Sequence, residues 1–87
     1  MAGCPAVQFE GVTRDRFTCL QQLVLDKAGV ALSGDVGTAS NGEENMEISW
    51  NFDEAAMVLT LEVTESAYPC FLVMPRLKSF VATCLGA

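Results

Sequence analysis

The chain has 87 residues, of which 51% are hydrophobic and 18% are charged, and its eleven acidic residues outnumber five basic ones to give a net charge of −6. This length suits one small domain, residues 1–87, and the hydrophobic fraction lies far from the composition of disordered chains. Because the field of a negative chain repels phosphate groups, we expect neither nucleic-acid binding nor binding to an anionic membrane surface.

The N-terminal part of the chain predicts an extended segment followed by a helix. Val7 and Phe9 alternate with polar residues, which is typical of a short edge strand or an ordered arm. Thr13 is an N-cap residue type, and Gly29 suits a left-handed C-cap. One helical stripe lies between them: Phe17, Leu20, Val24 and Ala28. We therefore predict a helix over about residues 13–28.

The next segment, residues 30–45, interleaves glycine with Ser, Thr, Asn and Asp, which is typical of turns. We predict a short strand at 30–33 and a mobile loop after it, and the sequence leaves open whether this segment is ordered. The stretch 34–42 has neither the Lys-Ser or Lys-Thr of a phosphate-binding loop nor the alternating acids and amides of a calcium loop. We therefore expect neither site there.

The clearest pattern in the chain is a β-hairpin with strands at about residues 46–52 and 57–64. Apolar residues occupy alternate positions in both strands, so the hairpin should bury one face. The apolar residues of this face are Met46, Ile48, Trp50 and Phe52 in the first strand and Met57, Leu59, Leu61 and Val63 in the second. This hairpin should form the centre of the core.

The register of the hairpin suggests a candidate binding site on its polar face. A turn centred on residues 54–55 would place Trp50 opposite Leu59 and would place Glu47 opposite Glu62. Two facing carboxylates could bind a cation, share a proton or receive a basic residue of a partner. The alternative is that both side chains extend into water at little cost. The candidate binding residues are Glu47, Ser49, Asn51, Thr60 and Glu62.

The C-terminal part predicts a second helix. Residues 70–74 form a continuous apolar run, which could be a further strand or a buried segment that leads into the helix. Pro75 suits the first turn of a helix. The residues that follow it carry one apolar stripe: Leu77, Phe80, Val81 and Cys84. We predict a helix over about residues 75–85.

These elements predict a two-layer α+β fold. Each helix has one apolar stripe and the hairpin has one apolar face, so a small antiparallel sheet covered on one face by two helices buries all of them. The chain has no histidine and no Cys-x-x-Cys spacing, which argues against Cys-His or Ser-His catalysis and against common redox and zinc sites. We predict no catalytic residue, no metal site and no cofactor.

The sequence also predicts the cellular compartment and the redox state of the cysteines. No run approaches the ~20 apolar residues of a membrane span, and the first residues lack the charged and hydrophobic regions of a signal peptide. We therefore expect a cytoplasmic protein. Four cysteines (Cys4, Cys19, Cys70 and Cys84) could form two disulfides in an oxidising compartment, but in the cytoplasm we expect reduced thiols.

The function predicted from these observations is association. A core this small gains from a partner, so we expect a non-catalytic protein that forms a homodimer or binds another protein. The alternative is a small-ligand or cation binding protein, or a minimal enzyme, that uses the polar sheet face around Glu47 and Glu62. A third option is an apolar ligand held between helices and sheet, which an abundance of flexible apolar residues permits: Met46, Met57, Met74 and Phe71.

Overall fold

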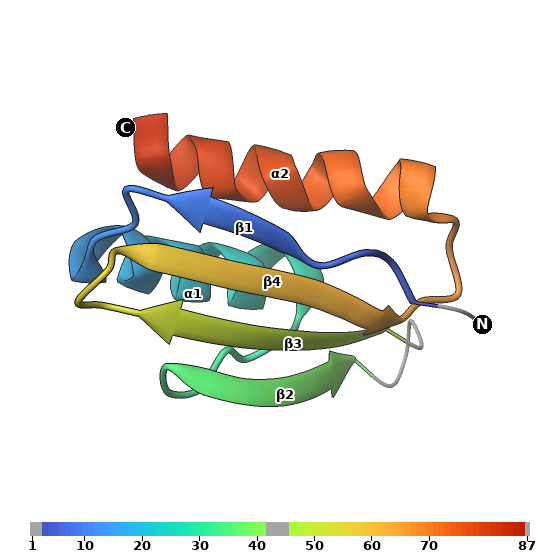
Figure 1. Ribbon diagram of the computed structural model, residues 1–87. Coiled ribbons are helices and arrows are strands. Elements are labelled where there is room, and N and C mark those ends of the chain that lie inside the picture. The colour runs from blue at the N-terminus through green and yellow to red at the C-terminus, as the bar shows by residue number, and fades with distance from the viewer. Residues whose placement is uncertain (1–2, 42–45, 87) are drawn as a thin grey trace.

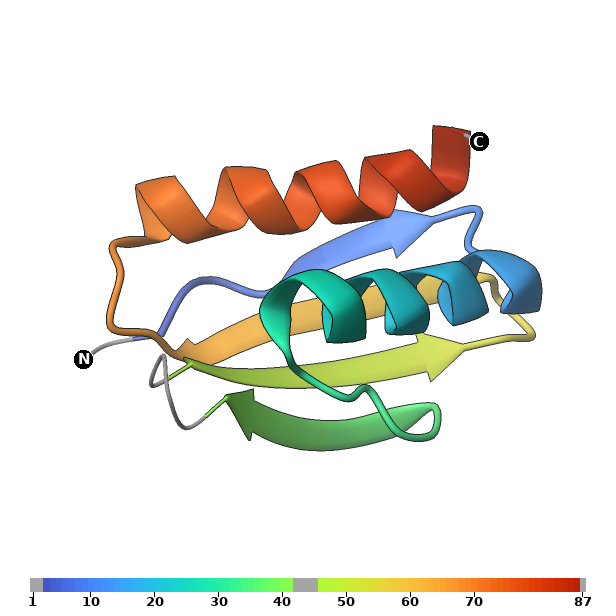
Figure 2. The same ribbon diagram turned by 180° about the vertical axis from the view of Figure 1, so that it is seen from behind.

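The computed structural model describes residues 3–41 and 46–86, which form one antiparallel sheet and two helices. In chain order the elements are β1 (Val7–Glu10), α1 (Arg14–Ala28), β2 (Val36–Asn41), β3 (Met46–Asp53), β4 (Val58–Glu65) and α2 (Cys70–Gly86). The strands lie in the order β1-β4-β3-β2. Both helices cover the same face of the sheet, as Figures 1 and 2 show from opposite sides. The predicted two-layer α+β fold is confirmed.

Helix α1 has the ends that the sequence predicts. The Thr13 hydroxyl accepts a hydrogen bond from the Arg16 backbone N–H at 3.3 Å, which caps the N-terminus. Gly29 has φ 70°, and its N–H donates to the Leu25 carbonyl at 3.1 Å. The inward face buries Phe17, Leu20 and Val24. The prediction of a helix over residues 13–28 is thus confirmed.

The β3–β4 turn lies one residue later in the chain than predicted, at 54–57 and not at 53–56, because β3 ends at Asp53 and β4 begins at Val58. The Asp53 carboxylate accepts a hydrogen bond from the Ala56 N–H at 3.1 Å, and Met57 has φ 56°, in the left-handed region. Met57 therefore lies in the turn, half exposed, and not on the buried face.

Moving the turn by one residue shifts the register of the hairpin by two residues. Trp50 lies opposite Leu61 and not opposite Leu59 as predicted. Because side chains alternate between the two faces of a sheet, a shift of two residues leaves the apolar residues within β3 and β4 on their predicted face. The inward face of the two strands accordingly buries Ile48, Trp50, Phe52, Leu59, Leu61 and Val63.

The prediction of a loop was wrong for residues 36–41, which form the edge strand β2. Gly37 pairs with Trp50, and a Cβ on Gly37 would lie 3.0 Å from the indole Cζ2, so the ring lies directly over this glycine. The indole N–H donates to the Gly34 carbonyl at 3.0 Å. The strand predicted at 30–33 is absent, although Val30 and Leu32 are buried. The rest of the predicted loop, residues 42–45, lies outside the described residues.

Helix α2 begins five residues earlier than the predicted start at Pro75. The Pro69 carbonyl accepts hydrogen bonds from the N–H groups of Leu72 and Val73 at 3.0 and 3.2 Å. The apolar run 70–74 is therefore the first part of the helix and not a strand, and Pro75 lies inside it. In residues 3–41 and 46–86, neither helix is long and apolar enough to cross a membrane.

All four cysteines are paired in disulfides, so the prediction of reduced thiols was wrong. Cys4 bonds to Cys70 and Cys19 bonds to Cys84, across sequence separations of 66 and 65 residues. The first bridge forms because the segment before β1 continues along β4, where the Cys4 N–H donates to the Val63 carbonyl at 2.7 Å. The second bridge ties α1 to the C-terminal part of α2.

Candidate functional site

The predicted binding residues share the outer face of the sheet, which neither helix covers. Ser49 lies opposite Glu62 and Asn51 lies opposite Thr60, so these four side chains form one polar patch on neighbouring strands. The Ser49 hydroxyl also makes a hydrogen bond of 2.8 Å with the Thr38 hydroxyl on β2. The structure therefore brings four of the five predicted residues together, on an open face of the sheet.

Glu47, the fifth predicted residue, does not face Glu62. The later position of the turn and an irregularity after Glu47 place it opposite Glu65, and its Oε1 accepts a hydrogen bond from the Thr64 hydroxyl at 2.7 Å. The prediction of a facing Glu47 and Glu62 pair was wrong for this reason. In the part of the chain that the structure describes, no group of three or more His, Cys, Asp and Glu residues could hold a metal ion.

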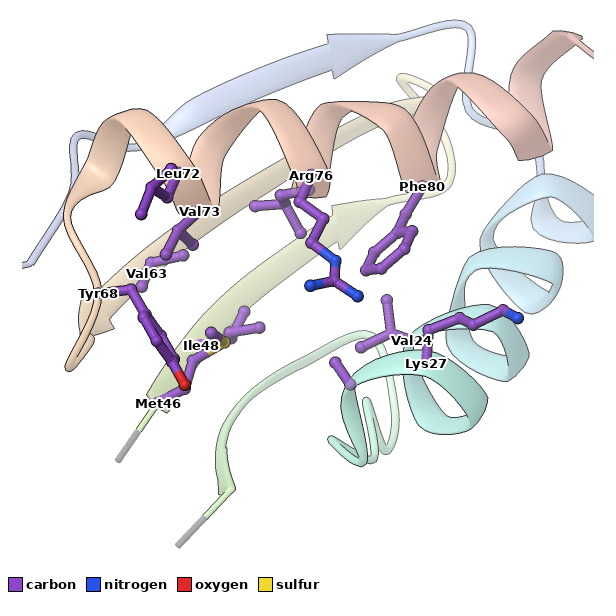
Figure 3. A pocket seen from close by; sticks show the side chains of 12 residues that line it. Val24, Lys27, Met46, Ile48, Val63, Tyr68, Leu72, Val73, Arg76 and Phe80 are labelled. Carbon is purple, nitrogen blue, oxygen red and sulfur yellow. The ribbon is translucent and has the colours of Figure 1, made fainter. Parts of the chain in front are cut away.

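A cavity lies on the other side of the sheet, between the sheet and the two helices. Its volume is about 410 Å³, and it is open to solvent. Figure 3 shows that its wall is formed by α1, α2 and the adjoining ends of β3 and β4. The buried residues of the wall are Val24 from α1, Ile48 and Val63 from the sheet, and Val73 and Leu77 from α2.

The position of the cavity follows from where the helices are tied together. The Cys19–Cys84 disulfide joins the N-terminal half of α1 to the C-terminal end of α2. The cavity lies at the opposite ends, between Val24 to Ala28 of α1 and Leu72 to Phe80 of α2. The two helices are therefore held together near the Cys19–Cys84 disulfide, and the cavity remains between them away from that bridge.

The rim of the cavity combines apolar and cationic side chains. Tyr68 and Leu72 line it and are 49% and 54% exposed, which is high for residues of their size. Figure 3 shows the Arg76 guanidinium extending from α2 into the space between the helices, whereas the Lys27 ammonium points away from it. Among the described residues that line the cavity, none carries a carboxylate.

A different cationic group, Arg14, is paired with two carboxylates at the other end of α1. It donates from Nη1 and Nη2 to the two carboxylate oxygens of Asp35 at 2.7 and 2.9 Å, and also to Glu54. Its guanidinium lies 5.1 Å from the centroid of the Phe52 ring. The hydrogen bonds from Arg14 hold the pKa of Asp35 below its ordinary value, and they raise the pKa of Arg14. This cluster joins α1 to Asp35, just before β2, and to the β3–β4 turn.

Sequence reasoning found few of the residues that line the cavity. Of the four residues named for an apolar ligand, only Met46 lines the cavity. Met57 lies in the turn, Phe71 is 75% exposed, and Met74 is half-buried against the core but does not line the cavity. Arg76 was not among the residues that the sequence analysis named for any site. The available signal was its spacing, since Leu72, Arg76 and Phe80 follow one another at intervals of four and therefore share one helical stripe.

Comparison with known proteins does not assign a family or a function to this chain. No family model matches the chain, and no curated protein and no solved structure is significantly similar to it. The function is therefore inferred from the cavity and the surfaces described above.

Proposed function

We propose that this protein is a non-catalytic binding protein that holds a small apolar molecule in the cavity between α1, α2 and the sheet. The observation that carries the proposal is an open cavity of about 410 Å³ with buried aliphatic walls. Sites for small molecules typically measure about 300–1,000 Å³ and have mostly apolar walls with few polar groups. Filling this cavity would remove its walls from water, at roughly 25 cal/mol for each Å² of apolar surface buried.

The test uses a neutral probe and two matched tryptophan variants. Nile red should bind the disulfide-bonded protein, with a rise in fluorescence that saturates. Leu72→Trp enlarges a side chain at the rim and should weaken binding by about tenfold, equivalent to 1.4 kcal/mol. Phe71→Trp is the control, because Phe71 is the neighbouring residue, is 75% exposed and does not line the cavity. Equal binding by both variants, or no binding by the parent protein, would contradict the proposal.

A second candidate function is the association predicted from the sequence. The specific observation is the edge strand β2, whose residue Val36 is 65% exposed. An unpaired strand edge can accept a strand of a second copy or of another protein, which would extend the sheet. This function uses a different surface from the cavity, so both can be tested on the same preparation.

The association is tested by light scattering over a concentration series under non-reducing conditions. A dimer through β2 should dissociate in Val36→Lys, because a lysine on an edge strand opposes strand addition. Met57→Lys is the control, since Met57 is also an exposed apolar residue but lies in the β3–β4 turn. A monomeric mass at every concentration would rule out self-association.

The compartment in which such a binding protein works is a separate question. The cytoplasmic location predicted from the sequence stays a prediction. The disulfides Cys4–Cys70 and Cys19–Cys84 argue against it, because disulfides persist in oxidising compartments and are rare in the cytosol. Non-reducing peptide mapping of the protein from its native source would decide between the two locations: bridged peptides support an oxidising compartment, and free thiols support the cytoplasm.

A further inference from the structure

We infer that the ligand of the cavity is an amphipathic acid, with its apolar chain inside the cavity and its single carboxylate bound by Arg76. This inference rests on the proposed function, because it names the ligand class for the same cavity. It follows from the charge of the rim, the direction of the arginine side chain and the size of the cavity.

The charge of the rim is opposite to that of the whole chain. Eleven acidic residues give the protein a net charge of −6, yet the cavity is lined by Lys27 and Arg76 and by no acidic residue among those described. In residues 3–41 and 46–86 the salt bridges are those of Arg14, so Arg76 has no carboxylate partner there. A guanidinium without a counter-ion beside an apolar cavity is a site for one negative charge.

The geometry places this charge where a ligand head group would lie. Figure 3 shows the Arg76 guanidinium across the opening between α2 and α1, with Phe80 farther along α2 on the same side. Leu72 is one turn before Arg76 and Phe80 is one turn after it, so the arginine is flanked by apolar side chains. The guanidinium fork matches both oxygens of a carboxylate, so Arg76 can bind the head group while the tail lies in the cavity.

The size and the overall charge define the ligand further. A volume of about 410 Å³ is near the lower end of the range for small-molecule sites, which favours a chain of medium length. The net charge of −6 repels anions in proportion to their charge. A polyphosphate would therefore be repelled strongly, whereas a monocarboxylate with an apolar tail meets little repulsion and gains from burial of the tail.

The experiment compares decanoate with decan-1-ol, two probes that share a chain and differ in the head group. Calorimetric titration of the disulfide-bonded protein at neutral pH should give a tighter Kd for decanoate than for decan-1-ol by about 10- to 100-fold, as expected for a hydrogen-bonded charged group. Arg76→Gln should remove this preference by weakening decanoate binding much more than decan-1-ol binding. Lys27→Gln is the matched control. It also removes one positive charge from the lining of the cavity, but the Lys27 ammonium points away from the space between the helices, so the preference for decanoate should remain.

The outcomes separate the inference from the proposed function. If the parent protein binds Nile red and binds both ten-carbon probes equally, the ligand class is wrong while the apolar binding function stands. If Lys27→Gln and not Arg76→Gln removes the preference for decanoate, the assignment to Arg76 is wrong. If neither the dye nor either probe binds, the proposed function itself fails. Arg76 is exposed, so an unchanged unfolding midpoint for Arg76→Gln would establish that its effect on binding is local.

Discussion

At the scale of single residues, the Arg14 and Asp35 pair makes stability depend on pH. Hydrogen bonds from Arg14 lower the pKa of the folded Asp35 carboxyl below its ordinary value. Because the pKa of Asp35 is lower in the folded than in the unfolded protein, the ionised carboxylate stabilises the fold at pH values above the unfolded pKa of about 3.9. This stabilisation is lost as the pH falls through the pKa of the folded protein. Both side chains are more than 40% exposed, at 43% and 44%, so solvent screens the pair and its contribution is small.

This pair predicts the behaviour of Asp35→Asn. The variant should be less stable than the parent protein at neutral pH, and the difference should shrink as the pH falls below the unfolded carboxyl pKa of about 3.9. Urea unfolding at a series of pH values measures the difference. Asp26→Asn is the control: its carboxylate accepts a hydrogen bond from Gln22 and makes no salt bridge to any described residue. An Asp35→Asn difference that stays constant with pH would contradict the prediction.

At the scale of elements, helix α2 contains a residue that its interior should disfavour. Pro75 has no N–H to donate to the carbonyl of Phe71, and its ring crowds that carbonyl. The helix nevertheless begins at Cys70, because Val73 packs into the core and Cys70 is bonded to Cys4. Tertiary contacts therefore outweigh the local cost of the proline.

We expect Pro75→Ala to stabilise the protein by about 1–3 kcal/mol, since alanine restores the backbone donor and favours a helix by about 3 kcal/mol over proline. The midpoint of urea unfolding at constant slope measures this gain. Ser79→Ala, at an exposed position of the same helix, should change stability by only a few tenths of a kcal/mol. A loss of stability in Pro75→Ala would mean that the core requires the geometry that proline imposes on α2.

At the scale of the whole molecule, both the small core and the two disulfides stabilise the fold. A chain of 87 residues buries only roughly 60–65% of its unfolded surface. Cys4–Cys70 and Cys19–Cys84 close loops of more than sixty residues, separations of 66 and 65, and so restrict the unfolded chain strongly. Both bridges fix α2, the first at its start and the second near its end.

Removal of either bridge should therefore lower the free energy of unfolding by about 2–4 kcal/mol. The variants are Cys4→Ala with Cys70→Ala, and Cys19→Ala with Cys84→Ala, measured by urea unfolding without reductant. A variant that lacks all four cysteines should be indifferent to dithiothreitol, which controls for effects of the reagent. Equal stability of the parent protein with and without reductant would show that the bridges contribute nothing.

The parts of the fold that were predicted correctly depend on local periodicity. Helix α1 has a cap at each end and one apolar stripe between them, and both signals lie within a few residues of the backbone that they specify. The two faces of the hairpin also follow from alternation alone. A register error of two residues preserves those faces, so they were correct although the Trp50 partner was not.

The parts that were missed depend on contacts between segments far apart in sequence. Residues 36–41 have the composition of a loop, and they form a strand because Trp50 lies over Gly37 and β3 supplies the hydrogen bonds. The facing pair of Glu47 and Glu62 depended on the position of the turn, which alternation does not specify. Arg76 belongs to the cavity only because α1 lies across from it.

The apolar period of each segment specifies which side must leave water, and this was enough to predict the two-layer architecture, helix α1 and the inward face of the hairpin. The folded chain was needed to define the register of β3 and β4, the edge strand β2, the early start of α2, the cysteine pairing and the cavity. Each of these features depends on which segments, far apart in sequence, come into contact in the fold. The periodicity of one segment carries no information about its partner segment.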